Sequence, residues 1–355
     1  MIIVVIAAQM LAACASPAPA PTAEPAAAVP ATEAPAPPPA TKGANAADQI
    51  RCVFPFWFGN APVFVANELG YFAEEGLKVT TAFDNDRANV MPAMAGGSVD
   101  CTIRTIGEEM SRPRAADTTG TVIGTIDISA GADGVVAGPE IKTVEDLIGK
   151  TLASEVNHPG TVLLQYALSQ KGKSIKDLTL KMIATDDSAA VFEDPSIAAV
   201  ATWEPMMSMI VKNSSRRGAH ILLSSKDFDG LITDVIRVRS DDLATNPKKY
   251  SKFLRGIYRA IDFYKTNSKK FVEISAPAFK VSIEEMTASL TGLRYTDFEE
   301  AVTYMPSTDG DGKLRGVFDS FNKINVELKL QDGPLNYVPF VDGSVIGNLF
   351  DGKKC

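Results

Sequence analysis

The sequence contains few residues of the kinds that hold metal ions or pair a nucleophile with a base. It has two histidines, His158 and His220, and four cysteines, with no Cys-x-x-Cys pair among them. Structural zinc sites need closely spaced ligands of these two types. No Gly-x-Ser-x-Gly motif is present, and a catalytic triad would have to use His158 or His220. We therefore predict no metal, no cofactor and no enzymatic activity.

Positive charge and long apolar runs are also scarce. Asp and Glu together number 43 against 35 Lys and Arg, which gives a formal net charge of -8. This balance argues against nucleic acid and against an anionic membrane surface as partners. After the N-terminus no apolar run reaches the ~18 residues of a membrane-spanning helix. The hydrophobic fraction of 45% is typical of a water-soluble globular protein.

The N-terminus has the pattern of an export signal followed by a spacer. The apolar run over residues 2–13 is too short to span a bilayer and ends in Leu11-Ala12-Ala13-Cys14, a lipoprotein cleavage pattern. No Lys or Arg precedes the run, so either the true start lies upstream or the cysteine is fortuitous. Residues 15–47 are rich in Ala and Pro and cannot bury enough apolar surface to fold. We predict a signal over residues 1–14, lipid attachment at Cys14 and an extended tether over residues 15–47.

From residue 48 onward, short apolar strands alternate with helices. Three strands are predicted over residues 50–54, 77–83 and 99–103. The helices between them begin at Pro62 and Asn89, and this β-α-β-α-β order predicts a parallel sheet covered by helices. Cys52 and Cys101 lie near the starts of two of these strands. They either form a disulfide outside the cytoplasm or remain buried thiols.

A second α/β run follows, and the last third of the chain is mainly helical. Strands are predicted over residues 134–137, 151–154, 178–183, 198–202 and 219–223. Asn246-Pro247 opens a long helix, and Ser282 and Thr296 are predicted to cap two more. We predict an α/β protein in which residues 48–130 and 236–355 form lobe 1 and residues 131–235 form lobe 2.

Four stretches carry a family resemblance, in a fixed order. They are residues 59–79 with Glu68-Leu69-Gly70-Tyr71-Phe72, residues 93–100, residues 134–150 and the Trp203-Glu204-Pro205 loop. Together they resemble periplasmic solute-binding proteins of the nitrate, sulfonate, taurine and bicarbonate group, which includes binders of thiamine precursors. The resemblance implies a type II periplasmic-binding-protein fold, with a ligand cleft between two α/β lobes. One departure is Ile197-Ala198-Ala199, where the family often has Val-Asp-Ala.

Aromatic and acidic residues gather where the predicted strands end. In open parallel sheets, ligands bind beyond the carboxyl ends of the strands. The predicted ligand-binding residues are Trp57, Asn60, Glu108, Asp127, Asp133, Glu155, Trp203, Glu204 and Asp234. For each acid, the alternative is a solvated surface position or a helix cap. For the two tryptophans, the alternative is packing in the core or over the surface.

The residues leave the charge of the ligand open. Acids beside aromatic faces suit a cationic or donor-rich ligand, such as a guanidine-like or urea-like molecule. Residues 129–134 resemble a subgroup linked with urea or guanidine metabolism. In contrast, Arg87 and Arg104 favour an anion such as a sulfonate or taurine.

The resemblance implies the solute-binding subunit of an ABC importer. Together with the N-terminal pattern, it predicts a lipid-anchored monomer outside the cytoplasm. Such a subunit delivers a small molecule to a permease driven by an ATPase subunit. The alternatives are an enzyme related to thiamine-pyrimidine synthesis and a sensor-associated binding protein. The related enzymes need a histidine and a cysteine-rich iron motif, and this sequence contains no such cluster.

Overall fold

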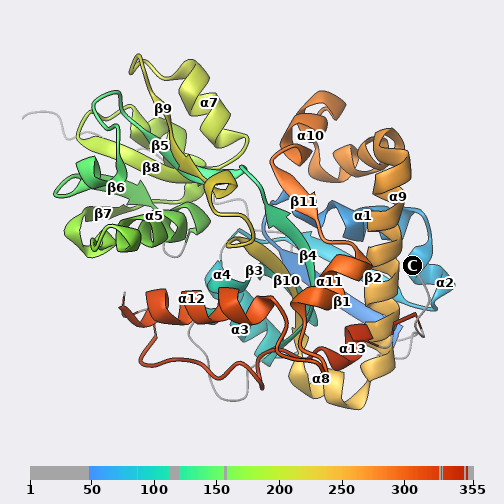
Figure 1. The fold of residues 1–355 in the computed structure, drawn as a ribbon. Coiled ribbons are helices and arrows are strands. Elements are labelled where there is room, and N and C mark those ends of the chain that lie inside the picture. Colours follow the sequence, from blue (N-terminus) through green and yellow to red (C-terminus); the bar gives the residue numbers. More distant parts are fainter. Residues whose placement is uncertain are drawn as a thin grey trace, which may run out of the picture. The chain divides into compact units, whose positions relative to one another are not determined.

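The computed structural model describes residues 48–85, 87–111, 120–155, 158–327, 329, 331–347 and 349–350. These residues belong to one compact unit, Ala44–Cys355, with an α/β fold built on two sheets (Figure 1). The predicted signal, its Cys14 and the tether over residues 15–47 lie outside the described residues. No helix within the described ranges has both the length and the apolar character needed to cross a bilayer.

The first sheet has six strands in the order β11-β4-β10-β3-β1-β2. Its strands are β1 (Gln49–Phe54), β2 (Lys78–Phe83), β3 (Cys101–Thr105), β4 (Gly120–Ser129), β10 (Thr233–Arg239) and β11 (Leu293–Tyr295). As the predicted β-α-β-α-β order requires, β1 pairs in parallel with β2 and β3. However, β10 runs antiparallel to both β3 and β4, and β11 runs antiparallel to β4. The predicted parallel arrangement is therefore confirmed for β1, β2 and β3, whereas the antiparallel strands make the whole sheet mixed.

The sequence analysis missed β4 and β10 because both strands are buried on both faces. All of β4 and nearly all of β10 are buried, so neither strand alternates between apolar and polar residues. Charged residues also interrupt their apolar runs. Arg237 of β10 is fully buried, and its Nη1 donates to Glu109 Oε2 at 2.8 Å. A buried ion pair of this kind allows a charged residue to lie in the middle of a sheet, which the sequence pattern alone does not indicate.

The second sheet has five strands in the order β7-β6-β8-β5-β9. Its strands are β5 (Asp133–Ala137), β6 (Thr151–Ser154), β7 (Thr179–Met182), β8 (Ile197–Trp203) and β9 (His220–Ser224). The sequence predicts all of them to within a residue or two. It does not predict their directions: β6 is parallel to β7 and β8, whereas β5 is antiparallel to β8 and β9. This sheet is therefore also mixed.

The helices pack against the sheets and against one another (Figure 1). They are α1 (Ala61–Glu68), α2 (Tyr71–Glu74), α3 (Arg87–Ala95), α4 (Ile106–Ser111), α5 (Pro159–Gln170), α6 (Ser188–Phe192), α7 (Met206–Asn213), α8 (Ser240–Thr245), α9 (Pro247–Phe279), α10 (Ile283–Leu290), α11 (Phe298–Tyr304), α12 (Leu314–Glu327) and α13 (Ser344–Gly347). Short 3-10 turns are η2 (Phe58–Asn60), η3 (Val144–Leu147), η4 (Ile175–Asp177), η5 (Thr185–Asp187) and η6 (Ser225–Asp227). The predicted cap at Thr296 is wrong by one residue, because Asp297 accepts the bond from Glu300 N at 2.8 Å.

Two helix contacts depend on side-chain size. The long helix α9 begins at Pro247 as predicted and packs on α1. Its buried face includes Phe253, whose ring stacks on Phe72 of α2 at 5.4 Å. Helix α12 packs on α4 at Gly107, where an added Cβ would lie 1.8 Å from Cε1 of Phe321. Glycine is therefore needed at this close approach.

Two chain segments connect the sheets. One joins β4 to β5 after Ser129, and the other joins β9 to β10 through η6. The hydroxyl of Ser225 in η6 lies 2.7 Å from the Ser129 hydroxyl and accepts a bond from Gly131 N at 2.7 Å. The two connections are therefore bonded side by side. The lobe boundary predicted between residues 130 and 131 lies in the first connection, and the one between residues 235 and 236 lies inside β10.

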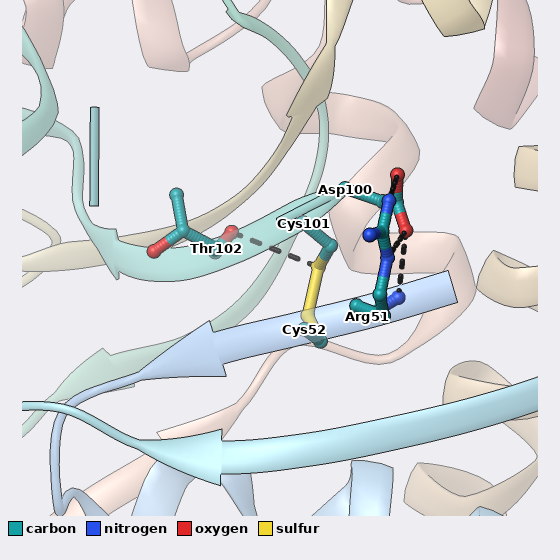
Figure 2. Close-up of a disulfide and its surroundings, with 5 residues drawn as sticks. All are labelled: Arg51, Cys52, Asp100, Cys101 and Thr102. Atoms are coloured by element: carbon teal, nitrogen blue, oxygen red, sulfur yellow. Dashed lines mark hydrogen bonds and ion pairs between the residues drawn. A yellow bond between two sulfur atoms is a disulfide. The ribbon is translucent and has the colours of Figure 1, made fainter. Parts of the chain in front are cut away.

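Cys52 and Cys101 form a disulfide between β1 and β3 (Figure 2). The two residues are directly opposite each other in the parallel pairing, and both side chains are buried. Beside the disulfide, the Arg51 guanidinium donates to both carboxylate oxygens of Asp100, with Nε and Nη2 at 2.8 and 2.9 Å. Of the two alternatives left open by the sequence, the structure contains the disulfide.

Candidate functional site

A small cavity is enclosed by residues from both sheets. It has a volume of about 20 Å³. Its walls are Pro55, Trp57, Arg104, Thr105, Glu108, Asp133, Pro159, Trp203 and Asp234. This volume is about that needed for one water molecule. Any larger solute therefore requires the walls to move apart.

Strand ends place the side chains around the cavity. Trp57 lies just after β1, and Thr105 is the last residue of β3. Asp133 begins β5 and pairs directly with Trp203, the last residue of β8. Asp234 is the second residue of β10 and lies opposite Thr105. The carboxyl ends of β1, β3 and β8 thus meet the starts of the antiparallel strands β5 and β10.

Two buried acids, hereafter the carboxyl pair, are associated with the cavity: Asp234 lines it, and Asp127 pairs with Asp234. Asp127 of β4 and Asp234 of β10 are directly opposite each other in the antiparallel pairing. Burial raises the pKa of Asp127 to about 7, against the opposing effect of hydrogen bonds from Trp57 and Asp234. Burial, followed by repulsion from Asp127 and Asp133, raises the pKa of Asp234 well above its usual value. The pair therefore holds a shared proton at neutral pH, with Asp234 donating to Asp127.

The two indoles are held by different contacts. Trp57 Nε1 donates to Asp127 Oδ1 at 3.1 Å, so the carboxyl pair fixes this ring. The Trp203 ring stacks on His158, with centroids 4.8 Å apart and planes 21° apart. His158 Nδ1 accepts from Gly160 N at 3.0 Å and so caps the start of α5. Because Nδ1 is an acceptor, the imidazole is neutral and carries its proton on Nε2.

Of the two arginines considered from the sequence, Arg104 lines the cavity. Its guanidinium is almost completely buried, and Nη2 donates to the Asp84 carbonyl oxygen at 2.8 Å. Its charge acts to lower the pKa of Asp234, although burial and the neighbouring acids outweigh it. Arg87 begins α3, and its side chain lies outside the described residues.

The structure brings most of the predicted site residues to this cavity. Trp57, Glu108, Asp133, Trp203 and Asp234 line it, and Asp127 lies behind Trp57. Glu108 also accepts from the backbone N and hydroxyl of Thr105, at 3.2 and 3.1 Å. Asp127 and Asp234 come from the neighbouring strands β4 and β10, Asp133 from β5 of the second sheet and Glu108 from helix α4.

Besides Asp127, three predicted residues do not line the cavity. Asn60 donates to the Pro55 carbonyl oxygen at 3.2 Å. Glu155 accepts from the Thr185 hydroxyl at 2.7 Å. Glu204 accepts from the backbone N and hydroxyl of Ser208 in the first turn of α7, at 3.0 and 2.9 Å. The contact of Glu204 thus fits the helix-cap alternative given for the acids.

The sequence analysis missed Pro55, Thr105 and Pro159 as wall residues and His158 as the support of Trp203. Thr105 could have been found, since it lies two residues after the predicted strand over residues 99–103 and next to Arg104. His158 gives a weaker signal, because a histidine before Pro-Gly has the appearance of an ordinary helix cap. Among the described residues, no group of three or more His, Cys, Asp or Glu side chains could hold a metal ion.

Comparison with known proteins supports both the resemblance and the fold. A profile described as NMT1/THI5 like matches residues 57–270, more than half of the chain. A Brucella abortus (strain 2308) protein named as a binding protein is 23% identical over 279 residues, covering 78% of this chain and 85% of that protein. An Aspergillus parasiticus 4-amino-5-hydroxymethyl-2-methylpyrimidine phosphate synthase is 25% identical over 221 residues, covering 58% of this chain and 62% of the enzyme.

Solved structures share the fold at low sequence identity. The periplasmic aliphatic sulphonate binding protein SsuA from Escherichia coli superimposes with a TM-score of 0.64 at 16% identity, covering 82% of this chain and 96% of SsuA. The periplasmic nitrate-binding protein NrtA from Synechocystis PCC 6803 gives a TM-score of 0.66 at 14% identity, covering 87% and 90%. The predicted type II periplasmic-binding-protein fold is thus confirmed. On the profile match, the chain belongs to the NMT1/THI5-like family.

Proposed function

We propose that this protein is the solute-binding subunit of an ABC importer. It captures a small polar molecule containing nitrogen or sulfur in the cavity between its two sheets. The observation that carries the proposal is that Trp57 and Trp203, from loops of different sheets, line one cavity. Family membership and the relatives named for binding support the same function.

Solute capture requires the two sheets to move relative to each other. The cavity of about 20 Å³ is too small for an organic solute, so the solute enters a more open form. We propose lobe 1 over residues 48–130 and 236–355, and lobe 2 over residues 131–235. The bonded connections at Ser129 and Ser225 are the proposed hinge, since within the described part of the chain both segments that join the sheets pass there. The solute shifts the population toward the closed form because it contacts both walls only in that form.

The protein acts outside the cytoplasm in this proposal, anchored by a lipid on Cys14 and extended on the tether over residues 15–47. The cleavage pattern before Cys14 supports the anchor. The Cys52–Cys101 disulfide supports an oxidising compartment. A monomer docks on a permease, which an ATPase subunit drives, and nucleic acid plays no part.

The test is a thermal-shift screen followed by titration. The screen uses taurine, alkyl sulfonates, nitrate, urea, guanidine and small amines, and a hit is titrated by tryptophan fluorescence. Trp203→Ala should weaken binding of the hit by at least ~10-fold, because loss of an aromatic wall of the cavity costs over ~1.4 kcal/mol. Leu180→Ala, at a half-exposed position of the same sheet, is the control and should bind like the parent. Equal affinity of Trp203→Ala and the parent would show that the cavity is not the binding site.

A second candidate function is an enzyme of pyrimidine synthesis. The observation that favours it is the likeness to the Aspergillus parasiticus synthase. Incubation of the protein with each hit, followed by mass spectrometry, separates the two functions. Saturable conversion of a hit would support the enzyme, whereas recovery of the unchanged hit would support the importer subunit.

A further inference from the structure

We infer that the solute is a small, flat cation with N–H donors, and that its binding expels the proton held between Asp127 and Asp234. The inference rests on the proposed function, since it assigns a charge and a proton balance to the same cavity. It selects the cation from the two ligand classes that the sequence leaves open.

The first observation is an unused acceptor at the cavity wall. Asp234 lines the cavity and is 5% exposed, and within the described part of the chain its Oδ1 accepts no hydrogen bond. Buried carboxyl oxygens are seldom left without a donor, because the loss of hydration is then uncompensated. A solute N–H group at the wall would supply the missing donor to Asp234.

The second observation is the balance of charge around the carboxyl pair. The groups facing it are Arg104 of β3, Glu108 of α4, Asp133 of β5 and Tyr295 of β11. Tyr295 donates to the Phe58 carbonyl oxygen at 3.1 Å and stays neutral, because burial raises its pKa. Among the described residues that line the cavity, Arg104 is the one cation, against the acids Glu108, Asp133 and Asp234. An anionic solute would add to this excess of negative charge, whereas a cationic one would offset it.

The third observation is the pair of indoles. Trp57 and Trp203 both line the cavity, and an aromatic face attracts a cation that lies over it. The Trp57 ring is tied to Asp127 through its Nε1–H, so the same acid that receives the charge also positions one wall. A flat cation fits between such walls with less separation of the lobes than a bulky one.

The proton balance follows from these contacts. Above about pH 7, where Asp127 is ionised, the unliganded carboxyl pair holds one proton, which Asp234 donates to Asp127. The cation places an N–H group against the pair, the shared proton leaves to solvent, and both carboxyl groups become carboxylates. One positive charge enters and one leaves, so the charge of the cavity is unchanged. No bond within the solute is formed or broken.

The pH dependence has a definite sign. Burial and mutual repulsion raise both pKa values of the pair in the unliganded protein, and a bound cation lowers them. Release of one proton per cation makes the affinity rise by up to ~10-fold per pH unit while the unliganded pair is protonated. An anion such as methanesulfonate would show the opposite dependence, with proton uptake.

The probes are acetamidinium, guanidinium and benzamidinium as flat cations, acetamide as the uncharged analogue of the first, and methanesulfonate as the anion. Calorimetric titration in buffers with different ionisation enthalpies counts protons. We expect one cation to bind at pH 7 with release of about one proton, and its Kd to fall between pH 6 and pH 8. Acetamide should bind at least ~10-fold more weakly, because it brings no charge.

Variants test whether the proton release comes from the carboxyl pair or from other acids. Asp234→Asn and Asp127→Asn should each abolish most of the proton release and flatten the pH profile. Asp241→Asn removes an acid that is 76% exposed and should leave both unchanged. If both pair variants fail to fold, titration of the Trp57 indole proton by NMR in the parent still tests the pair. That resonance should shift with pH between about 5 and 9, since Asp127 accepts its hydrogen bond.

Three results would overturn the inference. They are a bound cation with no proton release, saturable binding of methanesulfonate but of no cation, and no binding of any of the three cations at millimolar concentration. Saturable anion binding with a tryptophan fluorescence change would refute the assignment of a cationic solute but would still be consistent with the importer function. Chemical turnover of a bound cation would instead remove the importer function and leave the proton count intact.

Discussion

The stability of the protein should depend on pH through the carboxyl pair. Burial raises the pKa of Asp127 from 3.8 to about 7 in the folded protein. The folded state thus binds this proton more tightly than the unfolded state, so the proton stabilises the fold fully below about pH 4. That stabilisation is lost as the pH rises through about 7. At ~1.4 kcal/mol per pKa unit, the difference in unfolding free energy is at most about 4 kcal/mol.

Asp127→Asn removes this dependence while keeping the shape. The amide oxygen still accepts from Trp57 Nε1, and the amide cannot ionise. Scanning calorimetry between pH 5 and pH 8 should show the parent losing stability by up to ~1.4 kcal/mol per pH unit more steeply than the variant. Acids with lowered pKa values, such as Asp242 and Asp297, instead make the unfolding free energy rise with pH, but they do so only at lower pH. If the stability of the parent and that of the variant change with pH in parallel between pH 5 and pH 8, the reasoning is refuted.

Three further variants test the scaffold, each by thermal or chemical unfolding. Cys52→Ser opens a disulfide that spans 49 residues, and should cost about 4 kcal/mol by the loop-entropy relation, an effect that a reductant should reproduce in the parent. Gly107→Ala should destabilise by at least ~1 kcal/mol because its Cβ meets an α12 ring, whereas Gly316→Ala, with open space around it, should stabilise by up to ~1 kcal/mol. Glu109→Gln leaves the buried Arg237 without its charged partner and should cost ~3–5 kcal/mol; a cost below ~1 kcal/mol would contradict the assignment of a dry ion pair.

The part of the fold that follows local rules could be predicted from the sequence. Strands β1, β2 and β3 and the helices between them show turn glycines, a helix-starting Pro62 and compact apolar runs. Gly70, for example, ends α1 with a φ of 76°, which glycine adopts without strain. Strands β4 and β10 show none of these signals. Their place in the sheet depends on pairing with distant strands, and that pairing leaves no local periodicity.

The site residues also fall into those that the sequence could predict and those that it could not. The strand-end argument brings Trp57 and Trp203 to one cavity, because both follow or end strands of the sheets. Asp133 begins β5 and reaches the same cavity because β5 runs antiparallel to β8. It fails for Glu155 and Glu204, whose carboxylates are taken up by hydroxyls and a helix start nearby. A carboxylate after a strand and a carboxylate that caps the next helix have the same sequence pattern. Only the three-dimensional structure distinguishes the two roles.

The carboxyl pair and the connections between the sheets are parts of the same two strands. Asp127 lies two residues before Ser129, where β4 ends and the first connection begins, and Asp234 is the second residue of β10, just after the second connection. In the proposed function, a change in the charge of the pair would therefore act on the backbone next to the hinge about which the lobes rotate. Because Asp234 also lines the cavity, the proposal couples solute charge to lobe position through direct contacts. Closure driven by a neutral solute would leave the proton in place, so the proton count reports which solute closes the lobes.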